Sequence, residues 1–365
     1  MTTKKSSRKS AKSSISTSSS IIFTGLSDKQ VNSLRAAKQS ASQRLLPSRQ
    51  LVSFSALSAS TSPDPTTNLV GVGIGEQISG GKHTGIMAVK FLVRIKYPDN
   101  QIPDSDRLPG DVDGHPVDVE QVGTFRRFMA SSSAAATAMP NPRKKIRPAQ
   151  PGCSIGFKDP ANLMIMAGTF GALVGKGQKR FILSNNHVIA DENKLPVGSS
   201  IFQPGFLDAG NPPNNGPIAK LTKFIPLVFG GTMNHVDCAI AELNKTSLAN
   251  NSVLFIGPPK GKTPAQIDMV VHKFGRTTGF TVGRITSVET DVNVGYEGGT
   301  ATFDNQIIIV GLSAQPFSAG GDSGSLILER STNKAVGLLF AGSTTHTIAN
   351  HINDVLQALN VSLTL

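Results

Sequence analysis

Three apolar blocks separated by turn-rich sequence mark the first structured part of the chain. NLVGVGIG (68–75) and IMAVKFLVRIKY (86–97) are typical of strands, the second because apolar residues alternate along it. HPVDVEQVG (115–123) is typical of a third strand, and a stretch rich in Pro, Asp and Gly precedes it. This pattern predicts a small α/β domain over residues 67–125.

A different pattern begins near Gly152. Short runs rich in Val, Ile, Leu and Phe recur, separated by Gly, Pro and Asn. This spacing is typical of an all-β sandwich or barrel, so residues 152–365 are predicted to form a mainly β domain. Near the C-terminus the apolar residues instead recur at helical spacing, which predicts a terminal helix. These apolar positions are Ile352, Val355, Leu356 and Leu359.

Two segments lack such a pattern. Residues 1–66 are rich in Ser and Lys and predict a disordered tail. One short helix is predicted inside it, from Ser27 to about Leu46, because Ser27 and Gln30 have the spacing of a capping box. We favour a solvated tail over a docking segment. Residues 126–151 combine low-complexity ASSSAAATAMP with basic, proline-broken NPRKKIRPAQP and predict a linker.

The net charge of +12 is concentrated in the tail. Residues 1–50 hold ten Lys or Arg and only one acid, Asp28, so the remainder is mildly basic. No nucleic-acid motif is present, and nucleic-acid binding through the tail is kept only as an alternative. No apolar run reaches the roughly 18–20 residues of a membrane span. Two cysteines, Cys153 and Cys238, do not make a secreted disulfide framework, and we expect a soluble cytoplasmic protein.

Candidate chemistry lies in PFSAGGDSGSLIL (316–328), where glycines surround Ser323. A serine nucleophile needs open approach and free backbone N–H groups, and glycine permits both. It also needs a base and an orienting acid. RFILSNNHVIA ends a predicted strand at His187, and NHVDCAIAEL places Asp237 just before another. The alternative for each residue is structural: a glycine-rich turn and an ordinary strand-end histidine.

These motifs together resemble a known family. SNNHVIA, VDCAIAEL, FGRTTGFTVGRI and GGDSGSLIL resemble the chymotrypsin-fold serine proteases, whose triad runs His, Asp, Ser along the chain. That resemblance covers roughly residues 152–365. VGVGIGE and PVDVEQVG, ahead of RPAQPGCSIGF, are similar to bacterial trypsin-like peptidases related to plant Narrow Leaf 1 proteins. The resemblance implies a chymotrypsin-type double antiparallel β-barrel with a C-terminal helix, preceded by the small α/β domain and the disordered basic tail.

The resemblance also implies roles in a serine endopeptidase that cleaves protein substrates. Ser323 would attack the peptide carbonyl, His187 would accept its proton, and Asp237 would orient the imidazole. The N–H groups of Gly321 and Ser323 would form the oxyanion hole. No cofactor is expected, and no metal site, because no His or Cys pair has ligand spacing.

Two further sets of residues follow from the resemblance. Lys273 is predicted to pair with the acid before the serine, Asp322, so that no new N-terminus is needed; the alternative is a surface lysine. The position that usually supports the triad acid falls near Phe340, which leaves the support of Asp237 open, and His235 is a weaker substitute. The predicted substrate-binding residues are Phe317, Ser318, Phe340, Gly342 and His346.

The substrate preference follows from the predicted pocket. Phe317, six residues before Ser323, would form its floor and Gly342 its wall, which favours an apolar side chain. Ser318 and His346 instead favour an acidic or amide side chain, which ranks second, and a basic one ranks last.

Two classes of function stay open. One is regulated proteolysis inside the cell, in which residues 68–123 and the PRKKIRP linker restrain the protease. Within this class, the alternative role for the small domain is assembly of an oligomer. The other class is a protease-like module that binds a peptide as an added strand along residues 338–342 without turnover.

Overall fold

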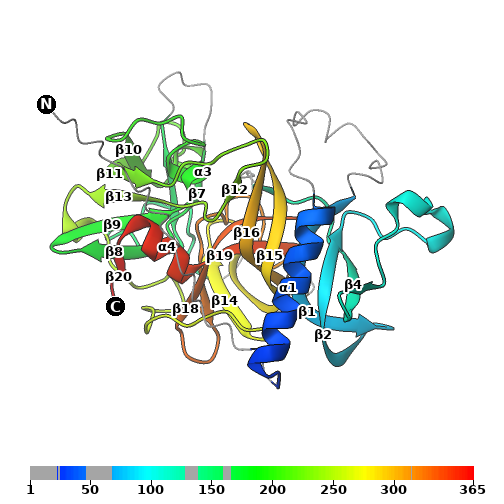
Figure 1. Cartoon of the computed structure of the whole chain (residues 1–365). Helices are drawn as coiled ribbons and strands as arrows, with labels where there is room; N and C mark the ends of the chain where they lie inside the picture. The colour runs from blue at the N-terminus through cyan, green and yellow to red at the C-terminus, as the bar shows by residue number, and fades with distance from the viewer. Residues whose placement is uncertain (1–22, 24, 47–67, 128–138, 159–165, 314) are drawn as a thin grey trace, which may run out of the picture.

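The computed structural model describes most of the chain beyond the tail (Figure 1). The predicted disordered tail lies largely outside the described residues, as does the low-complexity part of the predicted linker. The described residues are 23, 25–46, 68–127, 139–158, 166–313 and 315–365.

Six strands of the C-terminal half form a closed antiparallel barrel. They are β14 (Val270–Gly275), β15 (Gly279–Tyr296), β16 (Gly299–Gly311), β17 (Leu326–Glu329), β18 (Ala335–Gly342) and β19 (His346–His351). Their order is β14-β15-β16-β19-β18-β17, and β17 pairs back onto β14 to close the ring. Ile285, Ile309 and Leu339 are fully buried inside it, as expected for inward positions of a small barrel.

An eight-stranded sheet forms the other half of the fold. Its order is β20-β8-β9-β13-β11-β10-β6-β7, and all its pairings are antiparallel. The strands are β6 (Ser154–Phe157), β7 (Gly168–Thr169), β8 (Ala172–Lys176), β9 (Lys179–Ser184), β10 (Ser200–Gln203), β11 (Gly216–Phe224), β13 (Ala239–Leu243) and β20 (Ser362–Leu363). The predicted fold class is confirmed: the chain is mainly β, with one closed antiparallel barrel and one eight-stranded antiparallel sheet that forms a half-barrel.

The predicted terminal helix is α4 (Ile352–Leu359), and all four of its predicted apolar residues are buried. They pack in the core of the eight-stranded sheet, although α4 directly follows a strand of the closed barrel. The chain end therefore ties the two halves together, as Figure 1 shows for the red helix beside β8 and β9. Short elements complete the fold: η2 (Asp99–Gln101), η3 (Asp104–Asp106), η4 (Phe206–Asp208), η5 (Thr246–Leu248) and β12 (Met233–Asn234).

The predicted N-terminal strands exist, but they extend the sheet of the closed barrel. They are β1 (Leu69–Ser79), β2 (Lys82–Val93), β3 (Asp111–Val112) and β4 (His115–Gln121). β1 pairs with the second half of β15, where Gly71 lies opposite Val292, so the sheet is continuous. The physical reason is the length of β15: its 18 residues reach well past β14 and offer β1 a free edge.

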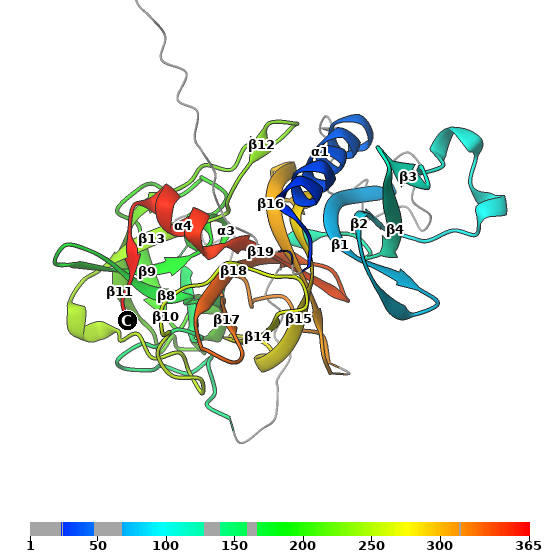
Figure 2. The same cartoon turned by 60° about the horizontal axis from the view of Figure 1, so that its bottom comes forward.

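The predicted helix in the tail is α1 (Asp28–Leu45), and both hydrogen bonds of its capping box are formed. The preference for a solvated segment is overturned for this helix. Its apolar face packs on the sheet, and Arg35 forms an ion pair of 2.7 Å with Glu289. Lys38 and Ser42 both donate to Asp291, at 2.5 and 2.6 Å. Figures 1 and 2 show α1 lying across the strands where β1 meets the barrel.

The second half of the predicted linker is packed against the eight-stranded sheet. The fully buried side chain of Gln203 accepts a hydrogen bond from the backbone N–H of Ile146 at 2.9 Å. The same side chain donates to the carbonyl of Lys144, also at 2.9 Å. The sequence predicted a linker because residues 141–151 are rich in proline and charge. In the structure, Gln203 at the end of β10 forms hydrogen bonds with backbone groups of this segment and holds it on the sheet.

Both cysteines are free and buried, and burial raises the pKa of the Cys153 thiol to about 12. Within the described part of the chain, no helix is both long and apolar enough to cross a membrane.

Candidate active site

His187 and Asp237 are brought into contact by the pairing of β9 with β13. His187 lies on the short helix α3 (Asn186–Ile189) directly after β9, and Asp237 lies two residues before β13. Ala239 is the register partner of Ser184, so the two chain segments meet at this edge. The imidazole Nδ1 of His187 lies 2.6 Å from Oδ2 of Asp237, and both side chains are completely buried.

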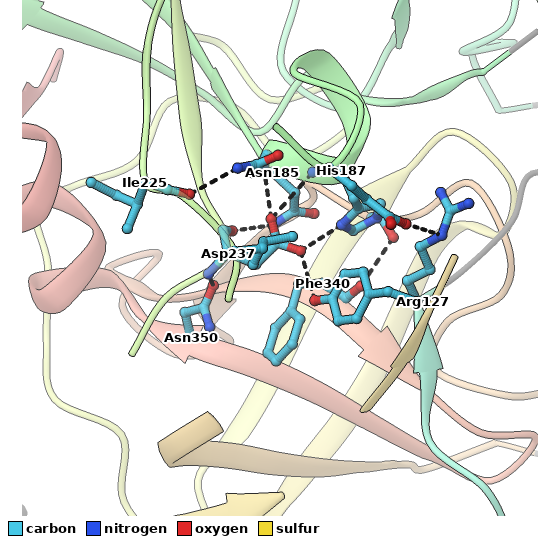
Figure 3. Close-up of polar contacts among 12 residues, drawn as sticks. Arg127, Asn185, His187, Ile225, Asp237, Phe340 and Asn350 are labelled. Atoms are coloured by element: carbon cyan, nitrogen blue, oxygen red, sulfur yellow. Dashed lines mark hydrogen bonds and ion pairs between the residues drawn. The ribbon is translucent and has the colours of Figure 1, made fainter. Parts of the chain in front are cut away.

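The second oxygen of Asp237 is also fixed. Oδ1 accepts a hydrogen bond of 2.7 Å from the backbone N–H of Asn186, and the Asp237 N–H donates to Asn350 at 3.1 Å (Figure 3). The local structure therefore holds Asp237 as an acceptor that faces the ring of His187.

Tyr296 is a contact that the sequence analysis missed. Its hydroxyl donates to Oδ2 of Asp237 at 2.8 Å, and its ring packs edge-on against His187 with centroids 5.9 Å apart. Burial raises the pKa of Tyr296 well above its usual value, and the charge of Asp237 adds to the effect, so the hydroxyl stays a donor. The available signal was weak: the chain has only two tyrosines. Tyr296 supplies the support that was sought near Phe340.

Ser323 lies in a tight turn between β16 and β17. Gly321 and Gly324 both have positive φ angles, +96° and +93°, which residues with a Cβ rarely adopt. A Cβ on Gly324 would lie 2.3 Å from Oγ of Ser184 and from the Thr169 carbonyl. Only glycine fits this position, because the turn packs directly on the eight-stranded half of the fold.

The peptide planes of this turn leave two N–H groups free. The carbonyl of Gly320 accepts from Oγ1 of Thr277 at 2.6 Å, and the carbonyl of Asp322 accepts from the N–H of Ser325 at 3.0 Å. In a trans peptide the N–H points away from the carbonyl. The N–H groups of Gly321 and Ser323 therefore face the opposite side, and neither meets an acceptor among the described residues. N–H groups without an internal acceptor are one requirement of an oxyanion hole.

Ser323 and His187 do not hydrogen-bond to each other in this structure. Oγ of Ser323 donates to the carbonyl of Phe340 at 3.2 Å. Nε2 of His187 is buried and has no partner among the described residues. In unliganded sites of this chemistry the contact between nucleophile and base is often loose.

The predicted pair of Lys273 and Asp322 is brought together. Nζ of Lys273 lies 3.5 Å from Oδ2 of Asp322, and both side chains are completely buried. Burial lowers the pKa of Lys273, and Asp322 offsets part of that shift. Asp322 also accepts from the N–H of Thr277 at 2.8 Å and from Oγ1 of Thr278 at 2.7 Å. The acid thus anchors the turn of Ser323 to the loop between β14 and β15.

The predicted substrate-binding residues separate into two groups. Ser318 and Gly342 line a cavity of about 670 Å³ beside the turn. Phe317 does not: it is buried in the barrel core, with Lys273 over its ring at 5.7 Å. The ring of Phe340 is buried as well and packs on Phe303. The prediction that Phe317 forms the pocket floor is therefore wrong. It was counted as six residues before Ser323, and that count does not fix which way a side chain in the loop between β16 and β17 points.

Two histidines are paired elsewhere. His346 is buried, and its Nε2 lies 3.1 Å from Glu120 of β4, so it does not face the cavity. His235 lies 2.6 Å from Asp304 and 3.4 Å from Asp354, so both of its ring nitrogens face carboxylates other than that of Asp237. Hydrogen bonds that His235 donates to the carboxylates of Asp304 and Asp354 raise the pKa of His235 to about 10, so it carries a charge at neutral pH.

One group of described residues has ligand atoms close enough for a metal ion. Oxygen or nitrogen atoms of Glu76, His83 and Asp268 lie within 4.8 Å of one another. Glu76 already accepts from His83 at 2.7 Å, and both His83 and Asp268 are exposed. These residues lie on other strands and loops than Ser323 and do not contribute to the candidate active site.

Comparison with known proteins places these features in context. The model of the Nal1 C-terminal domain matches residues 261–354, less than half of the chain. Thermobifida fusca protease A is 18% identical, with a TM-score of 0.41, over 59% of this chain and 97% of that one. A glutamic acid specific serine protease is 19% identical, with a TM-score of 0.41, over 59% and 100%. Cellulomonas bogoriensis chymotrypsin is 21% identical, with a TM-score of 0.36, over 54% and 90%. No curated protein sequence matches. Likeness this distant leaves the activity to be argued from the residues of this chain.

Proposed function

We propose that the chain is a serine endopeptidase in which Ser323 is the nucleophile, His187 the general base and Asp237 the orienting acid. One observation carries the proposal. A buried Asp–His pair has Nδ1 2.6 Å from Oδ2, and the glycine-bounded turn of Ser323, with two free N–H groups, packs on Ser184, three residues before His187. Structural histidines do not need an adjacent nucleophile and oxyanion donors, so the combination favours catalysis.

The proposed reaction is acyl transfer. Ser323 Oγ attacks the substrate carbonyl while His187 Nε2 accepts its proton, and the N–H groups of Gly321 and Ser323 bind the oxyanion. His187 then gives the proton to the leaving amine, and water hydrolyses the acyl-enzyme by the same route. Asp237 holds Nδ1 protonated throughout, and Tyr296 holds Asp237.

Removal of the nucleophile tests the proposal. Ser323→Ala is expected to abolish hydrolysis of a denatured protein such as casein, and Asp237→Asn to reduce the rate roughly 10⁴-fold because His187 takes the wrong tautomer. Ser331→Ala, which changes an exposed serine, is the matched control and is expected to leave the rate unchanged. Hydrolysis by Ser323→Ala at the wild-type rate would refute the triad assignment.

A second function is favoured by a specific observation. Ser323 Oγ donates to Phe340 rather than to His187, and His187 and Ser323 are only 0% and 1% exposed. A protease-like module that binds a peptide along β18 without turnover would keep this arrangement. Such a module binds peptide equally well with and without the substitution Ser323→Ala and releases no product, whereas an enzyme releases product only when Ser323 is present.

A further inference from the structure

A segment of the chain itself pairs with β18 beside Ser323. Strand β5 (Arg126–Arg127) is antiparallel to β18, with Arg127 opposite Ala341 and Arg126 opposite Gly342. The next residue of β18 is Phe340, whose carbonyl accepts the hydrogen bond from Ser323. Because the pairing is antiparallel, β5 runs from Gly342 toward the nucleophile.

This edge of β18 is where an extended peptide chain can reach Ser323. Peptides commonly bind a sheet edge as an added strand, with main-chain hydrogen bonds to the edge and alternate side chains in pockets. β5 already takes the main-chain pairing at Ala341 and Gly342. The near-complete burial of His187 and Ser323 agrees with an occupied site, because a protein substrate cannot reach a nucleophile that is 1% exposed.

The side chain of Arg127 lies in an acidic subsite. Nε of Arg127, which Figure 3 labels, is 2.7 Å from Glu192, and a second guanidinium nitrogen pairs with Glu297. The side chains of Arg127 and Glu192 are 3% and 1% exposed, and that of Glu297 is 30% exposed. Glu192 follows His187 by five residues and Glu297 follows Tyr296, so the subsite is built on the same two segments as the base and its support.

We propose that β5 is a pseudosubstrate: it occupies the strand position of the substrate, and Glu192 with Glu297 forms a subsite for a cationic side chain. The inference rests on the proposed function and adds its regulation and substrate class. Substrates are then extended segments that displace β5 and present Arg or Lys opposite Ala341.

A substrate that displaces β5 must bring a cation of its own to Glu192. Displacement of Arg127 leaves the buried carboxylate of Glu192 without its cation, and an unpaired buried charge costs several kcal/mol. Glu192 retains hydrogen bonds from the N–H groups of Glu297 and Gly298, at 3.2 and 2.9 Å, which hold it in place as an acceptor. A substrate Arg or Lys restores the ion pair, whereas an apolar or acidic side chain does not.

The tethering of β5 makes it a strong competitor. The N–H of Gly295 donates to the carbonyl of Phe125 at 3.1 Å, and Phe125 is buried in the core next to β5. A tethered strand acts at an effective concentration in the millimolar range, so a free peptide binds poorly until the tethered cation is removed.

Peptide binding by the full chain tests the proposal in the Ser323→Ala background, where catalysis plays no part. The probe is acetyl-GTFRRFMA-amide, which copies residues 123–130, and its analogue acetyl-GTFRQFMA-amide lacks the second cation. Adding Arg127→Ala is expected to tighten binding of the first peptide at least tenfold, and the analogue is expected to bind that variant at least tenfold more weakly. Arg126→Ala is the matched control on the same strand and is expected to change Kd less than twofold.

Two results would overturn the proposal: equal Kd values with and without Arg127, or equal binding of the two peptides to the Arg127→Ala variant. If Arg127→Ala does not fold, hydrogen exchange of the chain with intact Arg127 decides. Saturating Arg peptide should then speed exchange in residues 123–127, and unchanged exchange would contradict displacement. Hydrolysis that is absent from the chain with intact Ser323, or unchanged in Ser323→Ala, would refute the endopeptidase and leave these binding results untouched, so the two failures are distinguishable.

Discussion

Replacement of Lys273 by Met tests how the turn of Ser323 is held. The change keeps the length of the side chain and removes the cation that lies 3.5 Å from Asp322, with both side chains fully buried. Removing one partner of a buried ion pair typically costs about 3–5 kcal/mol. Asp322 keeps the donors Thr277 and Thr278, and the ion pair is long, so the lower end applies. We expect a loss of about 3 kcal/mol in the free energy of unfolding.

Urea unfolding at neutral pH measures that loss, and the kcat/KM for a peptide substrate measures its consequence at the site. Because Asp322 anchors the turn of Ser323, activity is expected to fall at least tenfold at a temperature where the variant is still folded. Lys260→Met is the control, since Lys260 is exposed. Lys273→Met with wild-type stability, within about 0.5 kcal/mol, and full activity would refute the reasoning.

Three further predictions follow from contacts of single side chains. Tyr296→Phe removes a hydrogen bond to a charged group, worth about 1.5–3 kcal/mol, so kcat/KM should fall roughly 10- to 100-fold. Tyr97→Phe, at the only other tyrosine of the chain, is the control and should leave kcat/KM unchanged. The raised pKa of His235, about 10 against 6.5, gives stability that is complete below pH 6.5 and lost as pH rises through 10. Urea titrations of Asp304→Asn across that range should lack most of this alkaline loss, and an unaltered pH profile would contradict the pairing. Burial raises the pKa of Glu120, but hydrogen bonds and charges of His346 and Lys90 lower it overall to about 2. The contribution of Glu120 to stability is therefore complete above pH 4.5 and lost as pH falls through 2. In Glu120→Gln, the free energy of unfolding measured in urea should depend less on pH in that acid range.

Local motifs predicted much of the fold and of the candidate site. The strand runs and the terminal helix follow from periodicity, and the capping box of α1 follows from two residues. Sequence motifs at predicted strand ends indicated His187 and Asp237, and the family resemblance indicated Lys273. The structure brings His187 to Asp237 and Lys273 to Asp322. Each of these contacts depends on strand ends that neighbouring sequence determines.

Contacts set by tertiary register were not predictable. The docking of α1 depends on Arg35 meeting Glu289, 254 residues further along the chain. Tyr296 reaches Asp237 only because the long strand β15 ends beside the other half of the fold. Phe317 lies in the loop between β16 and β17, so no strand alternation in the sequence indicates that its side chain enters the core. A single sequence contains no pattern that fixes such pairings.

Covalent labelling of Ser323 is the most direct test of the central claim. The full chain is treated with a small fluorophosphonate, and the adduct is located by peptide mass spectrometry. We expect one adduct on Ser323, formed at a rate that falls at least 100-fold in His187→Ala, because removal of the general base typically costs roughly 10²–10⁴-fold. Absence of an adduct on Ser323 in the folded chain, or an adduct rate independent of His187, would contradict the claim that these residues form a catalytic site.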